Sequence, residues 1–311
     1  MDRTKQPSPQ QIRIAFLVTA VGGLLFTFDL PLLRLSLADQ WTMVFTRGVF
    51  LFLAIAGAWL MARLLKGDRT PFIAGAAGLA VICSSTIGNM AYIGAIVHTN
   101  AANVVFIIAL TPVIAATLSR SVLGERIHPF TWAATVMAFL GAAIIAWDGI
   151  HSGDVLGDAL AFISACSSAT AFTIIRASGK KVATCLAVGS LVSALIALIF
   201  FGVMPSLLLA DGAFGLPAWF WLGLNGFIAI PLATVLLASG PRVLPSADVS
   251  MFFMLETVLT PVWIWLLFGE VPGRMVLIGG LLVIVTLMAH SWWRLALSVK
   301  QQPELVPNRQ T

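Results

Sequence analysis

Charged side chains are scarce in this sequence. Asp, Glu, Lys and Arg make up 10% of its 311 residues, against roughly 25% in an ordinary soluble domain. Hydrophobic residues make up 59%, and the mean hydropathy is +0.98. This composition excludes a soluble globular domain and predicts a polytopic membrane protein. The apolar stretches do not alternate with polar residues as in a β-barrel, and they have the roughly 20-residue length of membrane-spanning helices.

Other absences narrow the function. The sequence has three cysteines, without metal-ligand spacing, and we expect free, buried thiols, no disulfide and no metal. No phosphate-binding Gly-rich loop is present and no loop could hold a nucleotide-binding domain, so neither a cofactor nor an ATPase subunit is implied. The histidines lie near expected helix ends without a paired motif, which argues against a membrane-embedded enzyme. These residues are Cys83, Cys166, Cys185, His98, His128, His151 and His290.

A repeated motif divides the chain. The segment 110–125 contains Thr-Pro-Val and ends Leu-Gly-Glu, and the segment 255–270 contains Thr-Val and ends Phe-Gly-Glu. The shift, 270 − 125 = 145 residues, also superposes Gly57 on Gly202 and Gly78 on Gly223 without a gap. We therefore predict two similar halves, 1–150 and 151–300, followed by a disordered cytoplasmic tail, 301–311.

Hydropathy predicts five membrane spans in each half. The fold class is therefore an all-α integral membrane protein with ten transmembrane helices. Because five is odd, the second half must enter the bilayer from the opposite side, and the halves form inverted repeats, an architecture of secondary transporters. The expected spans are 12–33, 41–64, 71–93, 99–119, 129–148, 156–176, 185–209, 217–239, 246–268 and 273–293.

The positive charges orient these spans. With the amino terminus inside, only Arg34 and Arg274 of the 18 Lys and Arg residues lie outside and Arg47 lies within a span, which leaves 18 − 2 − 1 = 15 in cytoplasmic segments. Short positively charged loops stay cytoplasmic, so both termini are expected there. The net charge of +5 thus reflects topology, not a nucleic-acid partner.

Three features carry a family resemblance: the two five-helix halves, Arg47 in Phe-Thr-Arg-Gly, and the run from Pro-Val to Leu-Gly-Glu-Arg in the fourth span. In these features the sequence resembles the drug/metabolite transporter superfamily, in its amino-acid and metabolite exporter branch. Within it the chain is most similar to bacterial aromatic-amino-acid exporters. The resemblance implies a bacterial inner-membrane location, a central cavity between the halves and alternating access. Two departures stand out. Leu-Glu-Thr at 255–257 replaces Leu-Thr-Pro at 110–112, with a proline only at Pro261, which predicts a later kink in the ninth helix. Phe-Thr-Phe-Asp at 26–29 leaves the lining of the first helix open.

Intramembrane polar residues are the candidates for the substrate site, because such residues usually face protein or a water-filled cavity. Ser85, Asn89 and Tyr92 are spaced i, i+4 and i+7 on the third span and share one face, which lines a pathway or joins helices by hydrogen bonds. The sixth span carries Ser164, Ser167 and Ser168 among alanines. These small residues favour close packing, although the resemblance places the sixth helix beside the cavity, and we include Ser168 in the site.

Two further candidates lie near mid-depth. Asn225, in the eighth span, corresponds to Ala80 (225 − 145 = 80), so its polarity is peculiar to one half. Glu256 lies ten positions into the ninth span, about 15 Å along the helix. It either binds a proton or a substrate amino group, or it is a neutral acid that stabilises the irregular segment from Thr257 to Pro261.

The remaining polar residues are assigned structural roles. Asp29 and Arg47 are at similar depths on adjacent antiparallel helices and are predicted to form an ion pair, and Asp248, near a cytoplasmic helix end, is expected to be hydrated. Three more residues belong to helix ends and kinks: Pro112, Glu125 and Glu270. Gly before each glutamate ends one helix, and the carboxylate meets the positive start of the next.

The sequence therefore predicts a secondary exporter of small amphipathic metabolites, with neutral and aromatic amino acids as the substrate class implied by the resemblance. The alternatives are a nucleotide-sugar, quaternary-ammonium or broad drug carrier of the same superfamily and, more remotely, a membrane-embedded enzyme. The expected partners are a small-molecule substrate and the lipid bilayer, and a monomer is compatible with the sequence. The coupling ion stays open.

Overall fold

The computed structural model describes residues 9–67, 70–99, 104, 107–124, 128–146, 155–180, 182–202, 211–244, 248–249, 251–269 and 274–300. Within these ranges all regular secondary structure is helical, apart from one isolated β-bridge between Asp211 and Pro217. Six helical stretches are long and apolar enough to cross a membrane: Gln10–Ser36, Gln40–Leu65, Ala76–His98, Val155–Ser178, Ala183–Phe201 and Ala218–Arg242. Shorter apolar helices occupy the fifth, ninth and tenth expected spans, so the number of ten crossings stays a prediction.

The first half contains six described helices. These are α1 (Pro9–Phe26), α2 (Asp29–Ser36), α3 (Gln40–Lys66), α4 (Ala76–His98), α6 (Thr111–Leu123) and α7 (Pro129–Ala146). In the fourth expected span, α6 begins beside Pro112, which lies in its first turn, where a missing N–H is tolerated.

The first expected span is two helices rather than one. Pro31 has no N–H to donate to the Thr27 carbonyl, so the regular hydrogen-bond pattern is interrupted one turn before the proline. The N–H groups of Thr27 and Phe28 bond instead to carbonyls three residues back, at 3.2 and 3.3 Å. The break makes Asp29 the first residue of α2, where the positive end of a helix favours a carboxylate.

The second half has the same succession of elements. It contains α8 (Val155–Ser178), α9 (Ala183–Ile196) with a π-helical continuation (Ala197–Phe201), α11 (Ala218–Gly223), a π-helical turn (Leu224–Ala229), α12 (Ile230–Ser239), a 3₁₀ turn (Met251–Phe253), α14 (Met254–Phe268) and α15 (Arg274–Lys300). Pro231 removes an N–H just after the π-helical turn that holds Asn225, a common cause of such irregularity.

The late kink expected in the ninth span stays a prediction, because a proline can bend a helix without interrupting it. The chain is helical without interruption from Met254 to Phe268, through position 261, and its irregular part is the 3₁₀ turn that precedes Met254. The helix-end prediction is confirmed for the residues that the structure describes. Gly124 and Gly269 take positive φ angles of 65° and 71° after α6 and α14, and α7 begins at Pro129. Glu125 and Glu270 lie outside the described residues.

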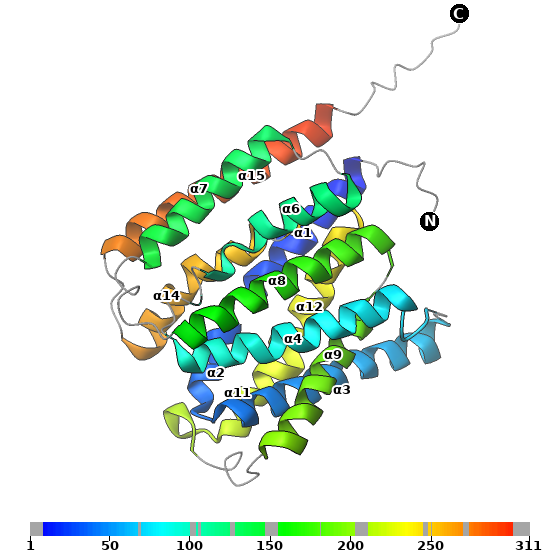
Figure 1. The fold of residues 1–311 in the computed structure, drawn as a ribbon, viewed down its shortest axis with the longest axis vertical. Helices are drawn as coiled ribbons and strands as arrows, with labels where there is room; N and C mark the ends of the chain where they lie inside the picture. Colours follow the sequence, from blue (N-terminus) through cyan, green and yellow to red (C-terminus); the bar gives the residue numbers. More distant parts are fainter. Residues whose placement is uncertain are drawn as a thin grey trace, which may run out of the picture.

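Extensive helix contacts join the two halves. α4 packs along α8, α3 along α9, α1 along α12 and α7 along α15. Figure 1 shows α7 and α15 side by side along one edge of the molecule, α3 and α9 at the opposite edge, and α4 and α8 between them. The site described below lies in this central part.

Small residues set the distance between the central helices. A Cβ added at Gly88 of α4 would lie 2.9 Å from the Ser167 Cβ of α8, and the Ser84 hydroxyl donates to the Ser167 carbonyl at 2.7 Å. The predicted close-packing role of the small residues on the sixth span is confirmed.

The expectation of three buried thiols is wrong for Cys83. Cys185 is buried and Cys166 half-buried, but Cys83 is exposed, and all three are free. Cys83 lies between Leu79 and Ile87, one turn away on either side, whose side chains are 56% and 54% exposed. This apolar stripe of α4 faces away from the protein, where a membrane helix meets lipid.

Candidate substrate site

A cavity of about 150 Å³ lies between helices of the two halves. Five of the six predicted binding residues line it: Ser85, Asn89, Tyr92, Ser168 and Glu256. The three from α4 face the same space, as their helical spacing predicts. Arg47 of α3 lines the cavity as well, and further serines together with apolar side chains such as Phe26, Leu51 and Phe172 complete the wall.

The predicted ion pair is present beside this cavity. Arg47 Nη2 donates to Asp29 Oδ2 at 2.6 Å. Asp29 is fully buried and Arg47 is 6% exposed. The break before α2 and the second turn of α3 bring the two side chains together, so the pair joins the first two membrane segments. Pairing relieves the large unfavourable free energy of burying each charge alone.

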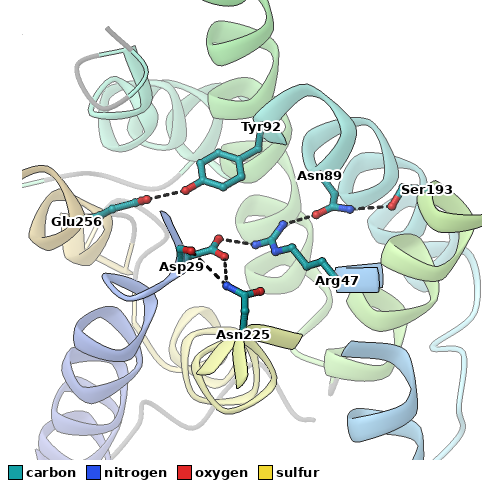
Figure 2. A network of polar contacts seen from close by, with 7 residues as sticks. All are labelled: Asp29, Arg47, Asn89, Tyr92, Ser193, Asn225 and Glu256. Carbon is teal, nitrogen blue, oxygen red and sulfur yellow. Dashed lines mark hydrogen bonds and ion pairs between the residues drawn. The ribbon is translucent and has the colours of Figure 1, made fainter. Parts of the chain in front are cut away.

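Asn225 belongs to this pair and not to the cavity wall. Its side-chain Nδ2 donates to the Asp29 carboxylate Oδ1 at 2.7 Å and to the Asp29 backbone carbonyl at 3.2 Å. The prediction that Asn225 lines the cavity is wrong. The π-helical turn that carries Asn225 directs its side chain toward α2. A residue of the second half therefore binds the Asp29 carboxylate of the first half (Figure 2).

Asn89 extends the network in the other direction. Its Oδ1 accepts a hydrogen bond from Arg47 Nη1, and its Nδ2 donates to Ser193 Oγ of α9 at 2.7 Å. Ser193 in turn donates to the Ser190 carbonyl at 2.7 Å. The amide thus uses both its acceptor and a donor to connect α3, α4 and α9, with each group correctly matched.

Tyr92, the only tyrosine of the chain, lies between the Arg47 guanidinium and the Glu256 carboxyl group. Its hydroxyl donates to Glu256 Oε1 at 2.7 Å, and the Arg47 guanidinium carbon lies 5.5 Å from the centre of its ring. Both Tyr92 and Glu256 are buried, at 5% and 3% exposure. The ring therefore separates a cation from an acid, as Figure 2 shows.

The network lies at one end of the cavity. On α3, which begins at Gln40, Arg47 lies closer to the start of the helix than Leu51, another lining residue. On α9, Ser193 follows the lining residue Ser190 along the chain, toward Phe201. On the eighth segment, Asn225 precedes the lining residue Ile230. These three displacements point to the ends that the positive-charge distribution assigns to the outer side.

A second buried polar cluster lies away from the cavity. His290 Nε2 of α15 is 3.5 Å from Asp248 Oδ1 and 3.3 Å from Thr131 Oγ1 of α7. Asp248 is 1% exposed and His290 2%. The expectation of a hydrated Asp248 is wrong. This residue is buried beside His290 of α15, a neighbour that its position near a helix end does not reveal.

Comparison with known proteins identifies the family. The model of the EamA-like transporter family matches the chain twice, over residues 8–147 and 155–292. The chain belongs to this family. The EamA-like family is a family of membrane transporters, not enzymes, within the drug/metabolite transporter superfamily. The chain is thus a multi-pass membrane protein, and the superfamily predicted from its motifs is confirmed.

One solved crystal structure, described only as that of a protein, superposes with a TM-score of 0.71 at 17% identity, over 91% of this chain and 98% of the other. At this identity the likeness concerns the fold alone. No match to a curated protein was found. Membership of the EamA-like family therefore identifies the chain as a member of a transporter family, without specifying its substrate.

Sequence reasoning missed two features of this site. Arg47 was assigned a structural role only, although it also lines the cavity. Ser193 was not singled out, because a lone serine in an apolar helix carries no distinguishing pattern. A signal for Arg47 was available: its predicted depth placed it near Asn89 and Tyr92, on the neighbouring helix of the same half.

Proposed function

We propose that this EamA-like protein is a secondary exporter of small amphipathic metabolites, with neutral and aromatic amino acids as its substrates, and that it works by alternating access through the central cavity. The observation that carries this proposal is the composition of the cavity wall. A cation and an acid, Arg47 and Glu256, lie in the wall on the two sides of Tyr92, and serine hydroxyls and apolar side chains form most of the rest. An amino acid with an apolar side chain has the complementary groups.

The cavity size favours this substrate class over a nucleotide-sugar. At about 150 Å³, the cavity is close in volume to an engineered protein cavity that holds one benzene molecule, which is the size of the ring of an aromatic amino acid. A nucleotide-sugar is several times larger, and its two or more phosphate charges would meet a single cation, Arg47, among the described lining residues. A permanently cationic substrate would be repelled by the same guanidinium.

The helix contacts support a two-fold relation between the halves. A shift of 145 residues superposes α1 on α8, and α4 on the segment formed by α11 and α12. The contact between α4 and α8 therefore has an equivalent in the contact between α12 and α1. The same shift carries α3 to α9 and α7 to α15, and each of these pairs is in contact. Inverted repeats related in this way exchange two conformations by moving against each other.

The polar network is the closed side of the proposed transporter. Asn225, Ser193 and Glu256 from the second half bond to Asp29, Asn89 and Tyr92 from the first. Trp263 of α14 adds a hydrogen bond to the Thr27 hydroxyl at 3.0 Å and stacks on Phe28 at the break before α2. Together these contacts close the cavity at its outer end, and the alternate state requires that they separate.

Reconstituted counterflow tests the substrate class. Proteoliposomes that contain the purified protein are loaded with one unlabelled solute and are offered the labelled solute outside. The panel includes phenylalanine, leucine, a nucleotide-sugar and a lipophilic cation. Exchange of the amino acids above that of protein-free liposomes supports the proposal, and exchange of only the nucleotide-sugar or the cation contradicts it.

Thiol accessibility tests the inverted topology. In a variant without native cysteines, His128→Cys and Gly273→Cys directly precede α7 and α15, and the shift of 273 − 128 = 145 residues makes the two positions equivalent. An impermeant maleimide added to intact cells should label the second variant and not the first. The reverse pattern refutes the orientation, and equal labelling of both refutes the inversion.

A further inference from the structure

Arg47 offers hydrogen-bond donors that the protein does not use. A guanidinium has five N–H donors, and two of them bond to Asp29 and Asn89. The Arg47 Nε is buried and has no hydrogen-bond partner. A buried donor without a partner is energetically unfavourable, and this donor belongs to a side chain that lines the cavity.

The other contacts of Arg47 hold it in place from behind. Asp29 does not line the cavity, and Asn225, which fixes the Asp29 carboxylate with two hydrogen bonds, does not line it either. Asn89 bonds to Arg47 from the side of α4. The guanidinium is therefore fixed in position and partly neutralised without a ligand, while its unused donors belong to a group of the cavity wall.

Glu256 supplies a carboxyl group across a single aromatic ring. Its carboxyl lines the cavity and accepts from the Tyr92 hydroxyl with one oxygen, Oε1. Figure 2 shows Tyr92 reaching Glu256 on one side and Arg47 lying on its other side. An α-amino acid carries one complementary group for each side of this ring, a carboxylate for Arg47 and an ammonium for Glu256.

We propose that Arg47 binds the substrate carboxylate and that Glu256 binds the substrate ammonium, which makes Arg47 the residue that selects carboxylate-bearing substrates. This inference rests on the proposed transport function and goes beyond it by naming the anion-binding residue. Arg presents a planar fork that binds a carboxylate through two parallel hydrogen bonds. The apolar side chains Phe26, Leu51 and Phe172 then receive the substrate side chain.

Transport of a matched pair of solutes tests the role of Arg47. Phenylalanine and 2-phenylethylamine differ only in the carboxylate, and wild-type protein should exchange the first in strong preference. The Asp29→Asn/Arg47→Gln variant removes both charges of the pair, so that neither is left buried alone. It should raise the half-saturating concentration of phenylalanine about 10- to 100-fold, the usual contribution of hydrogen bonds to a charged group, with little change for the amine. Arg63→Gln, an exposed position on the same helix, is the matched control and should keep the wild-type preference.

The ratio of the two solutes separates binding from structure. A purely structural role for Arg47 lowers exchange of both solutes by the same factor, whereas carboxylate binding lowers only that of phenylalanine. Arg47→Lys keeps a cation for Asp29 but loses the planar fork, and it should reduce the preference less. This variant decides the question by the same ratio if the double variant is not recovered in folded form.

A spectroscopic reading is available because Tyr92 is the only tyrosine. Protein labelled with 3-fluorotyrosine gives one ¹⁹F resonance, from the ring between Arg47 and Glu256. Phenylalanine should shift this resonance in the wild type at concentrations at least tenfold below those that 2-phenylethylamine requires, and the double variant should lose this difference.

The outcomes are distinguishable. If the wild type exchanges neither solute nor any other amino acid, the proposed function fails and the inference fails with it. If the wild type exchanges phenylalanine but the folded double variant keeps the wild-type ratio, or the wild type exchanges both solutes equally, only the role of Arg47 is refuted. Selective loss of phenylalanine exchange and of its ¹⁹F shift supports the inference.

Discussion

Neutralising one member of the Asp29–Arg47 pair should destabilise the protein more than neutralising both. In Asp29→Asn the buried Arg47 side chain, which is 7% exposed, loses its carboxylate partner, and in Arg47→Gln the fully buried carboxylate loses its cation. Breaking a buried pair on one side typically costs about 3–5 kcal/mol, because an uncompensated charge stays in apolar surroundings. Asp29→Asn should fall at the lower end, because an amide oxygen still accepts from Arg47.

The double variant Asp29→Asn/Arg47→Gln leaves no unpaired charge, so its stability should lie between those of the wild type and either single variant. The coupling free energy between the two sites is then about 3 kcal/mol or more, at the upper end of the range found for contacting residues. Thermal unfolding of the purified protein in detergent, followed by tryptophan fluorescence, measures the effect. Each single variant should lower the Tm by on the order of 10 °C.

Additivity of the two losses would refute the pairing. The control cycle combines Asp29→Asn with Arg63→Gln, which replaces an exposed arginine on the same helix. That cycle should be additive within about 0.5 kcal/mol, as for sites without shared partners. If the Asp29–Arg47 cycle is equally additive, the 2.6 Å contact contributes nothing to stability, and the network has no energetic basis.

Two further substitutions test the packing and the network separately. A Cβ at Gly189 would lie 1.9 Å from Ser85 Oγ, whereas nothing lies within 4 Å of one at Gly57. Gly189→Ala should therefore lower the Tm by several degrees, while Gly57→Ala should leave it unchanged or raise it slightly through its higher helix propensity; equal effects would contradict the close approach of α4 and α9. Tyr92→Phe removes the hydroxyl that donates to Glu256, and loss of this buried hydrogen bond should cost about 1–3 kcal/mol. An unchanged Tm would show that the bond is not formed.

The parts of the site that the sequence predicted depend on periodicity along one helix or on charge. Ser85, Asn89 and Tyr92 share a face because helical geometry places i, i+4 and i+7 together, and no tertiary information is needed. The Asp29–Arg47 pair follows from the cost of isolated charges in apolar surroundings, which leaves few alternatives for two opposite charges at one depth. The helix-ending glycines follow from their freedom to adopt positive φ.

The parts that the sequence did not predict depend on how helices from different halves meet. Depth alone placed Asn225 in the cavity, but the π-helical turn rotates it toward Asp29, and nothing in the local pattern reveals that rotation. Asp248 lies near a helix end, where exposure is the default expectation, yet it is 1% exposed beside His290. Both residues contact segments tens to hundreds of positions away, so their environment is fixed only by the tertiary fold.

The network gives a physical reason for substrate binding to favour the change of state. Separation of the halves breaks the bonds from Asn225 to Asp29, from Asn89 to Ser193 and from Tyr92 to Glu256, and each buried group left without a partner is costly. A zwitterionic substrate at the proposed site offers an ammonium to Glu256, which loses its Tyr92 partner, and a carboxylate to Arg47, whose Nε has no partner within the protein. A ligand shifts a conformational equilibrium only by its differential affinity for the two states. The ammonium bound to Glu256 supplies that differential affinity, and an amine without a carboxylate leaves the Arg47 Nε unpartnered, so it should bind and exchange more weakly.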